Sequence, residues 1–495
     1  GFANRAVGES KERIRGAFAT SRILLPRKRI TVNLAPADVP KVDSGFDLAI
    51  AVAILSADGQ VSLKAGGRQA FIGELGLDGS TRAVRGIIGK LLAGRAKGID
   101  TFYVPEANLE QARLVPKVHL VPVKDLGQLY GYLSAGTGCR PVDTGDGEGR
   151  VGRVQGGAAG RGEVGLSEIV GQAQAKRALE IAAAGGHNVF FDGPPGTGKS
   201  MLAKALPGLL PPLNREEILE VTQLHSLIGH DYEQIIAERP FRAPHHSASL
   251  VALTGGGASL RPGEISLAHR GVLFLDELPE FNRETLEALR QPLENRTISV
   301  TRAHGTARYP ANFIFVATAN PCPCGYAGSS KACQCQESQI NYYRSRLSGP
   351  ILDRIDLYSN VHEVDHDRLL TQMADPEADE AVRSRVAGAR AIQARRFARA
   401  GAAAGASSPA AAVRLNADMS NADIKRLAGI GPEARQILNR AARQLDLSAR
   451  AYMRTIKVAR TIADLEESPE VTAAHLAEAL NYRPNLRPGP VSGTH

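Results

Sequence analysis

A phosphate-binding loop in the middle of the chain constrains its fold more than any other feature. Residues 193–200 read GPPGTGKS and match the pattern G-x-x-x-x-G-K-[S/T] at every position. The loop follows an apolar run at residues 188–191 and leads into a helical pattern at residues 201–209. This order predicts an α/β fold with a parallel sheet and a nucleotide at its carboxyl end. A chance glycine-rich turn, the alternative, would not explain the flanking strand and helix.

The residue types in this loop indicate how it binds ATP. Its glycines let backbone N–H groups curl around phosphates, and the start of the following helix adds a partial positive charge. The lysine reaches the outer phosphates, and the serine hydroxyl is a ligand for Mg²⁺. The predicted nucleotide-binding residues are Gly193, Pro194, Pro195, Gly196, Thr197, Gly198, Lys199 and Ser200.

A second motif, GVLFLDE at residues 271–277, supplies the acidic groups that ATP hydrolysis requires. Its apolar residues predict a buried strand that ends at Asp276 and Glu277. We expect Asp276 to bind the nucleotide's Mg²⁺ together with Ser200, and Glu277 to orient or deprotonate the attacking water. Such a strand end is common by itself, and it becomes informative downstream of a phosphate-binding loop.

A third apolar strand, predicted at residues 313–317, leads to Asn320. Its amide is placed to hydrogen-bond the terminal phosphate or the water, which is a catalytic sensing role. The alternative is a strand-end turn with Pro321.

Two arginines further along the chain complete the predicted catalytic set. Arg354, in the segment SGPILDRIDL, is a candidate finger that stabilises phosphate charge in a neighbouring subunit. An ion pair with Asp353 or Asp356 is the alternative. Arg450, at the start of a helix, is a candidate sensor of the phosphates, and the competing choices are Arg454 and Arg460.

Length and composition indicate several domains and a polyanionic partner. A chain of 495 residues exceeds one hydrophobic core, and its formal net charge of +9 favours nucleic acid. No apolar run is long enough for a membrane span, so we expect a cytoplasmic protein with no membrane partner. The predicted parts are an α+β domain at 1–134, a flexible linker at 135–165, the ATPase core at 166–364, a helical lid at 365–482 and a tail at 483–495.

The order of these motifs resembles the YifB/ComM family of bacterial magnesium-chelatase-like AAA+ proteins. Besides the segments above, the resemblance includes RPFRAPHHSAS, LTGGG, ATANPCPCG and LSARAYMRTIKVARTIADL. It implies an AAA+ core, a homohexameric ring and, for the ComM type, branch migration of DNA during uptake of foreign DNA. A chelatase-like or protein-remodelling ATPase with a protein target is the alternative.

The first domain is similar to the proteolytic domain of Lon over residues 71–105. The resemblance places the nucleophilic serine of Lon-like proteases at Gly45 and the catalytic lysine at Ile88. It therefore implies a retained fold without peptidase chemistry, since a Ser–Lys dyad needs both groups within hydrogen-bond reach. A gapped alignment that pairs Ser44 with Lys90 is the alternative. The resemblance also implies that a family segment normally precedes residue 1.

Four of the five cysteines lie close together in the pattern C-x-C-x₈-C-x-C. Four thiolates on two short arms predict a closed, tetrahedral structural Zn²⁺ site. The alternatives are free buried thiols or redox-active cysteines. The predicted zinc ligands are Cys322, Cys324, Cys333 and Cys335.

Residues 297–308 (TISVTRAHGTAR) predict a β-hairpin. In the ring motor that the family resemblance implies, such a hairpin lines the pore. Arg302, His304 and Arg308 would there contact DNA phosphates. The alternative is a solvated hairpin. A basic run further on, from Arg383 to Arg399, is either a solvated helix face or a second DNA contact.

Overall fold

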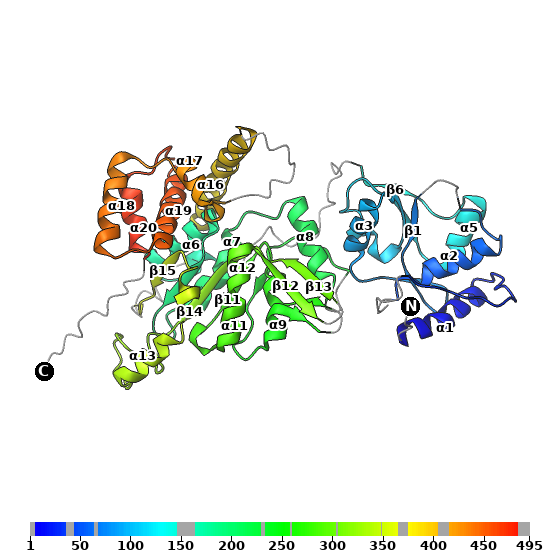
Figure 1. Cartoon of the computed structure of the whole chain (residues 1–495), viewed down its shortest axis with the longest axis horizontal. Coiled ribbons are helices and arrows are strands. Elements are labelled where there is room, and N and C mark those ends of the chain that lie inside the picture. Colours follow the sequence, from blue (N-terminus) through cyan, green and yellow to red (C-terminus); the bar gives the residue numbers. More distant parts are fainter. Residues whose placement is uncertain are drawn as a thin grey trace.

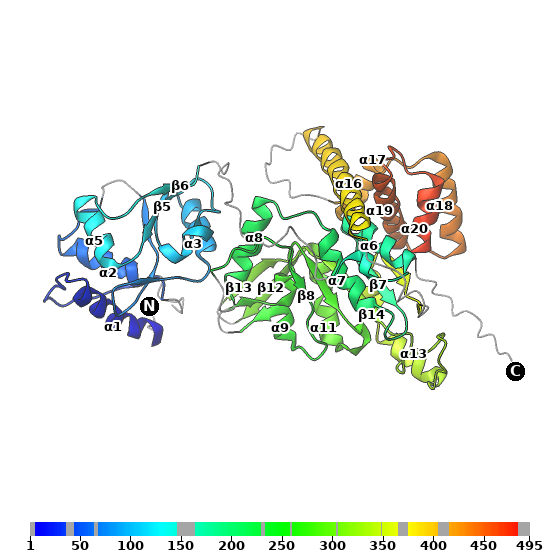
Figure 2. The same ribbon diagram turned by 180° about the vertical axis from the view of Figure 1, so that it is seen from behind.

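The computed structural model divides into an N-terminal α/β domain, a central ATPase core and a C-terminal bundle of helices (Figures 1 and 2). It describes residues 5–35, 44–63, 68–145, 164–228, 233–257, 260–302, 305–347, 349–364, 375–403 and 415–483. Among these residues, no helix has the length and apolar content to cross a bilayer.

The N-terminal domain is built on a small mixed sheet with strand order β1-β4-β5-β6. The first three strands run parallel, and β6 is antiparallel to β5. Its elements are α1 (Arg5–Thr20), α2 (Asp47–Ala57), β1 (Gln69–Phe71), β2 (Glu74–Leu75), β3 (Thr81–Arg82), α3 (Ile87–Ala96), β4 (Thr101–Pro105), η1 (Glu106–Asn108), α4 (Leu109–Ala112), β5 (His119–Val123), α5 (Leu126–Ala135) and β6 (Val142–Asp143).

Two expectations for this domain differ from the structure. Residues 29–33 (RITVN) have a strand-like composition, which predicts a strand, but they form none in the described structure. The domain also continues past residue 134, because β6 pairs with β5 and Cys139 is buried in the same core. The predicted linker therefore begins later, and residues 146–163 lie outside the described part.

The N-terminal domain packs against the ATPase core through α8 (Arg215–His225). Ile218 and Val221 of α8 join the apolar core formed by α3 and strands β4 and β5. The Gln111 amide donates to the carbonyl of Gln234 at 2.9 Å, and Arg215 donates to the carbonyl of Arg113 at 3.1 Å. This shared apolar cluster ties the two domains together.

The ATPase core contains a parallel five-stranded sheet with order β15-β7-β14-β11-β8. The expected strands are present as β7 (Val189–Asp192), β11 (Val272–Leu275) and β14 (Ile314–Ala319). Every residue of β11 and β14 is buried, as expected for central strands of a parallel sheet. Because β14 lies between β7 and β11, the ends of all three strands meet at one edge. The α/β fold class is confirmed.

The remaining elements of this core include β8 and β15, the two edge strands of the sheet. In chain order, the remaining elements are η2 (Leu166–Glu168), α6 (Ala173–Gly185), α7 (Lys199–Leu209), β8 (Phe241–Arg242), α9 (Leu250–Thr254), β9 (Gly255–Gly256), β10 (Arg261–Pro262), α10 (Glu264–Leu267), η3 (Leu278–Glu280), α11 (Arg283–Ala288), α12 (Arg290–Asn295), β12 (Thr297–Arg302), β13 (Gly305–Pro310), α13 (Glu337–Ser345), α14 (Gly349–Leu352) and β15 (Leu357–Asn360).

The C-terminal part is all helical and packs on the ATPase core. Helices α16 and α19 contact α6, and their apolar side chains share one core with β7 and β14. The elements are α16 (Pro376–Ala403), η4 (Asn416–Asp418), α17 (Asn421–Leu427), α18 (Pro432–Gln444), α19 (Ala449–Leu465) and α20 (Ala473–Asn481). A helical lid following the sheet agrees with the predicted fold class.

Candidate ATP site

The predicted phosphate-binding loop joins the carboxyl end of β7 to the amino end of α7. Gly196 and Gly198 have φ angles of 79° and 88°, a region that favours glycine. Gly193 is needed for a different reason, since a Cβ atom there would lie 2.2 Å from the carbonyl oxygen of Val361. The sequence thus gives the loop the freedom to curl around phosphates at the start of α7.

Lys199 is the most buried charged group of the loop, with 8% of its surface exposed. Its ammonium donates to the carbonyls of Gly193 and Pro194, at 2.5 and 2.8 Å, and to the Asn320 Oδ1 atom at 3.1 Å. Burial lowers the pKa of Lys199, and the negative charge of Asp192 is the strongest of the effects that oppose this lowering. The lysine therefore already faces the amide that was predicted to act as sensor.

The two predicted carboxylates follow β11 and are both exposed. Ser200 Oγ donates to the Asp276 Oδ2 atom at 3.0 Å, so the two predicted Mg²⁺ ligands are adjacent. Glu277 has a φ angle of 53°, which is unusual for a residue with a side chain. Such a conformation costs energy for a residue with a side chain and is often found at functional sites, and Glu277 adopts it directly after β11.

Thr318 links the Asp276 carboxylate to the backbone of Glu277, and no sequence motif predicted this residue. Its hydroxyl donates to the Asp276 Oδ1 atom at 2.5 Å and accepts from the backbone N–H of Glu277 at 3.0 Å. Thr318 is fully buried on β14, two residues before Asn320. The two-residue periodicity of a strand places both side chains on one face, so this signal was present in the sequence.

Tyr343 of α13 is a second residue of this site that the sequence did not reveal. Its side chain is buried, and the backbone of Asn320 lies close enough to its hydroxyl to lower its pKa against the larger effect of burial. Burial raises the pKa of Tyr343 to about 12, and the charges of Glu280 and Glu277 act in the same direction. The phenol therefore stays protonated beside the acidic edge. None of the sequence motifs described above includes Tyr343.

The residues present fit a magnesium nucleotide. The loop offers backbone donors at a helix start, and the paired Ser200 hydroxyl and Asp276 carboxylate are hard oxygen ligands suited to Mg²⁺. When bound, Mg²⁺ would neutralise charge on the phosphates, while Lys199 holds their outer oxygens. Glu277 and Asn320 lie on either side of Thr318 and face the same edge.

The candidate finger, Arg354, is bonded within its own chain. Arg354 is 9% exposed, and it forms an ion pair with Glu294 rather than with Asp353 or Asp356. It also donates to the Pro350 carbonyl. Within a single chain this arginine is thus engaged, and its role as a finger stays a prediction.

In the lid, Arg460 is buried and pairs with Asp464 at 2.7 Å, which is a structural role. Arg454 lies 3.6 Å from Asp356 and so connects α19 to the segment before β15. Arg450 is exposed in the first turn of α19 and forms no ion pair with the described residues. Of the three lid candidates, Arg450 is the one left available to a ligand.

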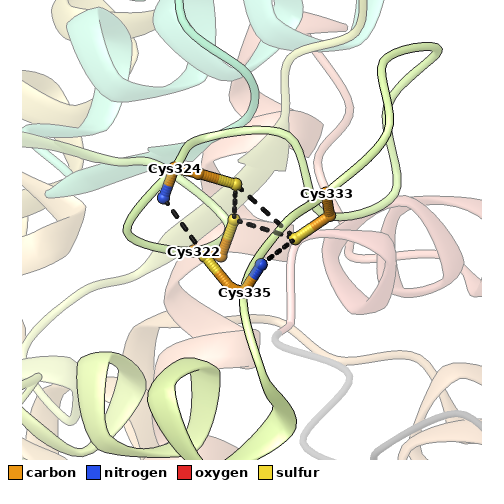
Figure 3. Close-up of side chains that lie close together, drawn as sticks. All are labelled: Cys322, Cys324, Cys333 and Cys335. Carbon is orange, nitrogen blue, oxygen red and sulfur yellow. Dashed lines mark hydrogen bonds between the residues drawn. The ribbon is translucent and has the colours of Figure 1, made fainter.

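The four clustered cysteines lie between β14 and α13, and their sulfur atoms converge (Figure 3). All four are free thiols, with sulfur atoms within 4.8 Å of one another. The Cys322 sulfur is 3.3 Å from that of Cys324 and 3.7 Å from that of Cys333. A tetrahedral site with Zn–S bonds of about 2.3 Å has S–S edges of about 3.8 Å. The arrangement therefore fits a four-thiolate zinc site.

Backbone N–H groups also point at these sulfur atoms. Ala327 donates to the Cys322 sulfur at 3.3 Å, and Cys324 donates to the Cys335 sulfur at 3.4 Å. Donors from the backbones of Tyr326 and Gln334 lower the pKa of Cys324 to about 6. Such bonds stabilise thiolates and are typical of the surroundings of metal-bound cysteine.

The cysteine-containing loop contacts the phosphate-binding loop directly. A Cβ atom added at Gly325 would lie 2.8 Å from the Cδ atom of Pro195. On its other side the loop leads into α13, where Arg346 pairs with Glu280 of η3 at 3.4 Å. The cluster thus fixes a segment that touches both halves of the ATP site.

The predicted hairpin is formed by β12 and β13, which pair from Thr297↔Pro310 to Arg302↔Gly305. Arg308 is exposed and lies opposite Ser299, so it is nearer the middle of the hairpin than its turn. Its guanidinium donates to the Thr297 hydroxyl at 3.2 Å. His304 and the side chain of Arg302 lie outside the described residues.

The basic helix α16 uses much of its charge inside the molecule. Arg385 pairs with Glu180 of α6 at 2.7 Å, and Arg396 pairs with the buried Asp464. Arg383 donates to the carbonyl of Gly208 at 2.9 Å, and Arg390 donates to that of Ala183 at 2.8 Å. These arginines attach the lid to the core, so the run is neither a simple solvated face nor a continuous DNA-binding stripe.

In the N-terminal domain, Ser44 and Lys90 bond to different groups. The Ser44 hydroxyl donates to Glu74, and the Lys90 ammonium donates to the Arg85 carbonyl at 2.6 Å. Gly45 and Ile88 occupy the positions that the resemblance assigned to the catalytic pair. Residues 40–43 of the aligned segment lie outside the described part.

Comparison with known protein families agrees with this site. The family model of magnesium chelatase, subunit ChlI, matches residues 165–369. A second model, subunit ChlI of Mg-chelatase, matches residues 1–108, and the ChlI C-terminal model matches residues 376–483. The fold and the site define an AAA+ ATPase of the magnesium-chelatase type, a class that uses ATP and Mg²⁺.

Individual relatives narrow this class further. Competence protein ComM of Haemophilus influenzae is 41% identical over 493 residues, which cover 98% of this chain and 92% of that protein. Protein YifB of Salmonella typhimurium is 39% identical over 486 residues, covering 98% and 90%. The magnesium-chelatase 38 kDa subunit of Rhodobacter capsulatus is 29% identical over 176 residues, covering 32% and 50%. The chain belongs to the YifB/ComM family.

Proposed function

We propose that this protein is a ring-forming motor that couples ATP hydrolysis to branch migration of DNA during natural transformation. The observation that carries the proposal is its identity of 41% with competence protein ComM along 98% of the chain. The formal net charge of +9 also suits a polyanionic substrate.

In this proposal each polar group of the ATP site has one task. Lys199 binds the outer phosphate oxygens, and Ser200 and Asp276 hold the magnesium ion. Glu277 accepts a proton from the attacking water, which Asn320 helps to orient. Thr318 is a positioning residue, because its hydroxyl fixes one oxygen of Asp276 and the backbone of Glu277.

The hairpin of β12 and β13 is the proposed contact with DNA. Arg308 is exposed on it, and Arg302 and His304 stand beside its turn in the sequence. A motor must hold many different sequences, so contacts to phosphates through charged side chains suit the task better than contacts to bases. The hairpin is exposed on the side of the core toward the N-terminal domain (Figure 1).

We also propose that the active form is a homohexamer, with Arg354 acting on the nucleotide of a neighbour. The arginine finger requires Arg354 to leave its partner Glu294, which is itself partly exposed. An exchange of ion-pair partners on assembly would make hydrolysis depend on the ring. Arg450 would sense the phosphates from the lid of the same chain or of its neighbour.

The cysteine cluster is proposed to hold one structural Zn²⁺ ion. Four thiolates fill the tetrahedral coordination sphere and leave no position for a substrate, so the ion has no catalytic task. Its effect would be to fix Gly325 against Pro195 of the phosphate-binding loop.

The alternative function is protein remodelling, as for a chelatase-like ATPase with a protein target. It is supported by the likeness to the 38 kDa subunit of magnesium chelatase, which covers only 32% of this chain. The DNA proposal is preferred because the likeness to ComM covers all three parts of the structure.

The deciding experiment measures ATP turnover and movement of a four-way DNA junction by the full chain. Junction binding should weaken steeply with salt, and ATP should drive migration. Removing Arg302 and Arg308 together should reduce the salt slope and migration while basal ATP turnover remains. Arg440→Ala, at an exposed position of α18, is the matched control. A wild-type protein that neither binds nor moves the junction at moderate salt would favour the protein-remodelling alternative.

A further inference from the structure

A small basic cavity lies at the end of the ATPase sheet opposite the nucleotide site. Its volume is about 50 Å³, and four arginines line it together with two acids. Gly186, Gly271 and Ile314 also line it, and they precede or begin β7, β11 and β14. The phosphate-binding loop follows the carboxyl end of β7, so in this parallel sheet the cavity is at the other edge.

The cavity is shared by the core and the lid. Arg239, Arg270 and Arg296 come from the core, whereas Arg390 comes from α16 of the lid. Asp418 of η4 is also a lid residue. A ligand in this cavity would therefore touch both parts at once.

The charges around the cavity do not balance. Arg239 pairs with Glu217 at 3.3 Å, Arg270 with Glu220 at 2.8 Å, and Arg296 with Asp418 at 3.2 Å. Arg390 alone has no carboxylate partner among the residues that the structure describes. Four guanidinium groups thus line the cavity with two carboxylates, those of Glu217 and Asp418, while Glu220 pairs with Arg270 from outside the lining.

Arg390 also has unused hydrogen-bond donors. Its Nε atom donates to the carbonyl of Ala183 at 2.8 Å, and its two terminal nitrogens have no protein partner in the described structure. A guanidinium carries five N–H groups in a planar fork, which suits the oxygen atoms of an oxyanion. Burial lowers the pKa of Arg390 to about 9, and the neighbouring charge of Arg239 acts in the same direction. By its exposed surface Arg390 is only half-buried, and the charges of Glu217 and Asp418 oppose this lowering of its pKa, so its free terminal nitrogens are accessible to a small anion.

We propose that this cavity binds one small tetrahedral oxyanion, of the phosphate or sulfate class, between the core and the lid. A volume of about 50 Å³ accommodates about three to five water-sized atoms, which matches the four oxygens of such an ion. A nucleotide or a DNA backbone is too large. The bound ion would tie α16 to the core and so restrict the movement of the lid.

The test uses sulfate as the probe and measures its binding by equilibrium dialysis at constant ionic strength. All proteins carry Lys199→Ala, so that the phosphate-binding loop does not contribute its own anion site. We expect about one sulfate per chain, with affinity reduced at least about tenfold by Arg390→Gln, as is usual for losing a charge-assisted pair. Arg395→Gln is the matched control, because Arg395 is exposed on the same helix and bonds only within it.

Three outcomes would overturn the proposal. These are no saturable sulfate binding by the Lys199→Ala chain, equal binding by the Arg390→Gln and control proteins, or an equal loss in both. If Arg390→Gln does not fold, Arg390→Lys replaces it. A lysine keeps the charge but not the planar fork, so its sulfate affinity should fall several-fold. Unchanged affinity in that folded variant would equally count against the site.

Discussion

The nucleotide site and the N-terminal domain both carry segments related to catalytic patterns, yet their polar side chains are arranged in opposite ways. At the nucleotide site, Lys199 bonds to Asn320, Ser200 bonds to Asp276, and Thr318 joins Asp276 to Glu277. In the N-terminal domain, Ser44 bonds to Glu74 and Lys90 to a backbone carbonyl. One region forms a connected set, and the other forms two separate hydrogen bonds.

This difference shows what turns a matching segment into a working site. A nucleophile or base acts only through partners within hydrogen-bond reach. The ATP site obtains them because three parallel strands end together at one edge of the sheet. The N-terminal sheet still packs, but among the described residues Ser44 and Lys90 bond to different groups. We therefore expect that this domain keeps its fold without peptidase chemistry.

The largest effect on ATP turnover is expected from a change at Arg354. Like Ser44 and Lys90 of the N-terminal domain, this candidate catalytic residue bonds to a group outside its expected site, since it pairs with Glu294. If Arg354 serves a neighbour, Arg354→Ala should lower ATP turnover by about 10³–10⁵. A mixture with Lys199→Ala chains should recover part of the activity that each lacks alone. Turnover of the mixture, with co-assembly shown by native mass spectrometry, is the measurement. A co-assembled mixture as inactive as its components would place Arg354 with the purely structural arginines.

Glu277→Gln should lower ATP turnover by about 10²–10⁴, the usual cost of losing a general base. ATP binding should persist, since Lys199, Ser200 and Asp276 remain. Single-turnover hydrolysis and nucleotide binding, measured on the same preparation, separate the two effects. Near-normal hydrolysis by Glu277→Gln would mean that Glu277 is not the general base.

Much of this site was predictable from the sequence because its parts are local. A glycine-rich loop, a buried strand and the polar residue after it are each encoded within a few neighbouring residues. The strands β7, β11 and β14 were expected for the same reason. The contact of α16 with α6 and the contact of α8 with the N-terminal domain depend instead on packing between distant segments.

The residues that the sequence did not reveal are those that act through distant contacts. Tyr343 reaches Asn320 from α13, beyond the cysteine-containing loop. Arg354 was predicted to be a finger, with an ion pair to Asp353 or Asp356 as the alternative, but in the single chain it pairs with Glu294, sixty positions earlier. Thr318 was within reach of strand periodicity but carries no motif. Residues 29–33 have the composition of a strand, but a strand also needs a partner to pair with.

Thr318→Ala tests whether the hydrogen bonds from Thr318 to Asp276 and Glu277 matter for ATP turnover. Thr318 itself is not expected to contact the substrate. Loss of its hydroxyl frees one oxygen of Asp276 and leaves the Glu277 N–H without its acceptor. Small displacements of catalytic groups cost up to about 10²-fold, so we expect turnover to fall by about 10- to 100-fold with a smaller change in KM. Thr318→Ser keeps the hydroxyl and should restore most of the rate. Equal loss in both variants would indicate a packing role only.

The zinc proposal predicts a smaller effect, felt mainly as stability. Elemental analysis should find about one zinc per chain. Cys333→Ser should remove the zinc, because the site then has three thiolate ligands instead of four. Cys333 is chosen because it is exposed, so its replacement changes the packing little. Loss of about 1 kcal/mol would lower the Tm by about 2–4 °C. Cys139→Ala, outside the cluster, should leave the zinc content unchanged. A folded wild-type protein without metal would contradict the proposal.

The smallest effect on ATP turnover is expected from Ser44→Ala and Lys90→Ala, and it sharpens the comparison from the other side. Ser44→Ala removes the bond to Glu74, and Lys90→Ala removes the bond to the Arg85 carbonyl. A hydrogen bond contributes about 0.5–1.5 kcal/mol of folding free energy, and neither of these bonds reaches the ATP site. ATP turnover should therefore stay at the wild-type value. Cleavage of a fluorogenic peptide should be equally low in the wild type and both variants, with and without ATP. If instead the wild type cleaves the peptide and both variants lose that activity, Ser44 and Lys90 must meet in a working conformation. The N-terminal domain would then be a second enzyme, and the separation of fold from chemistry in this chain would not hold.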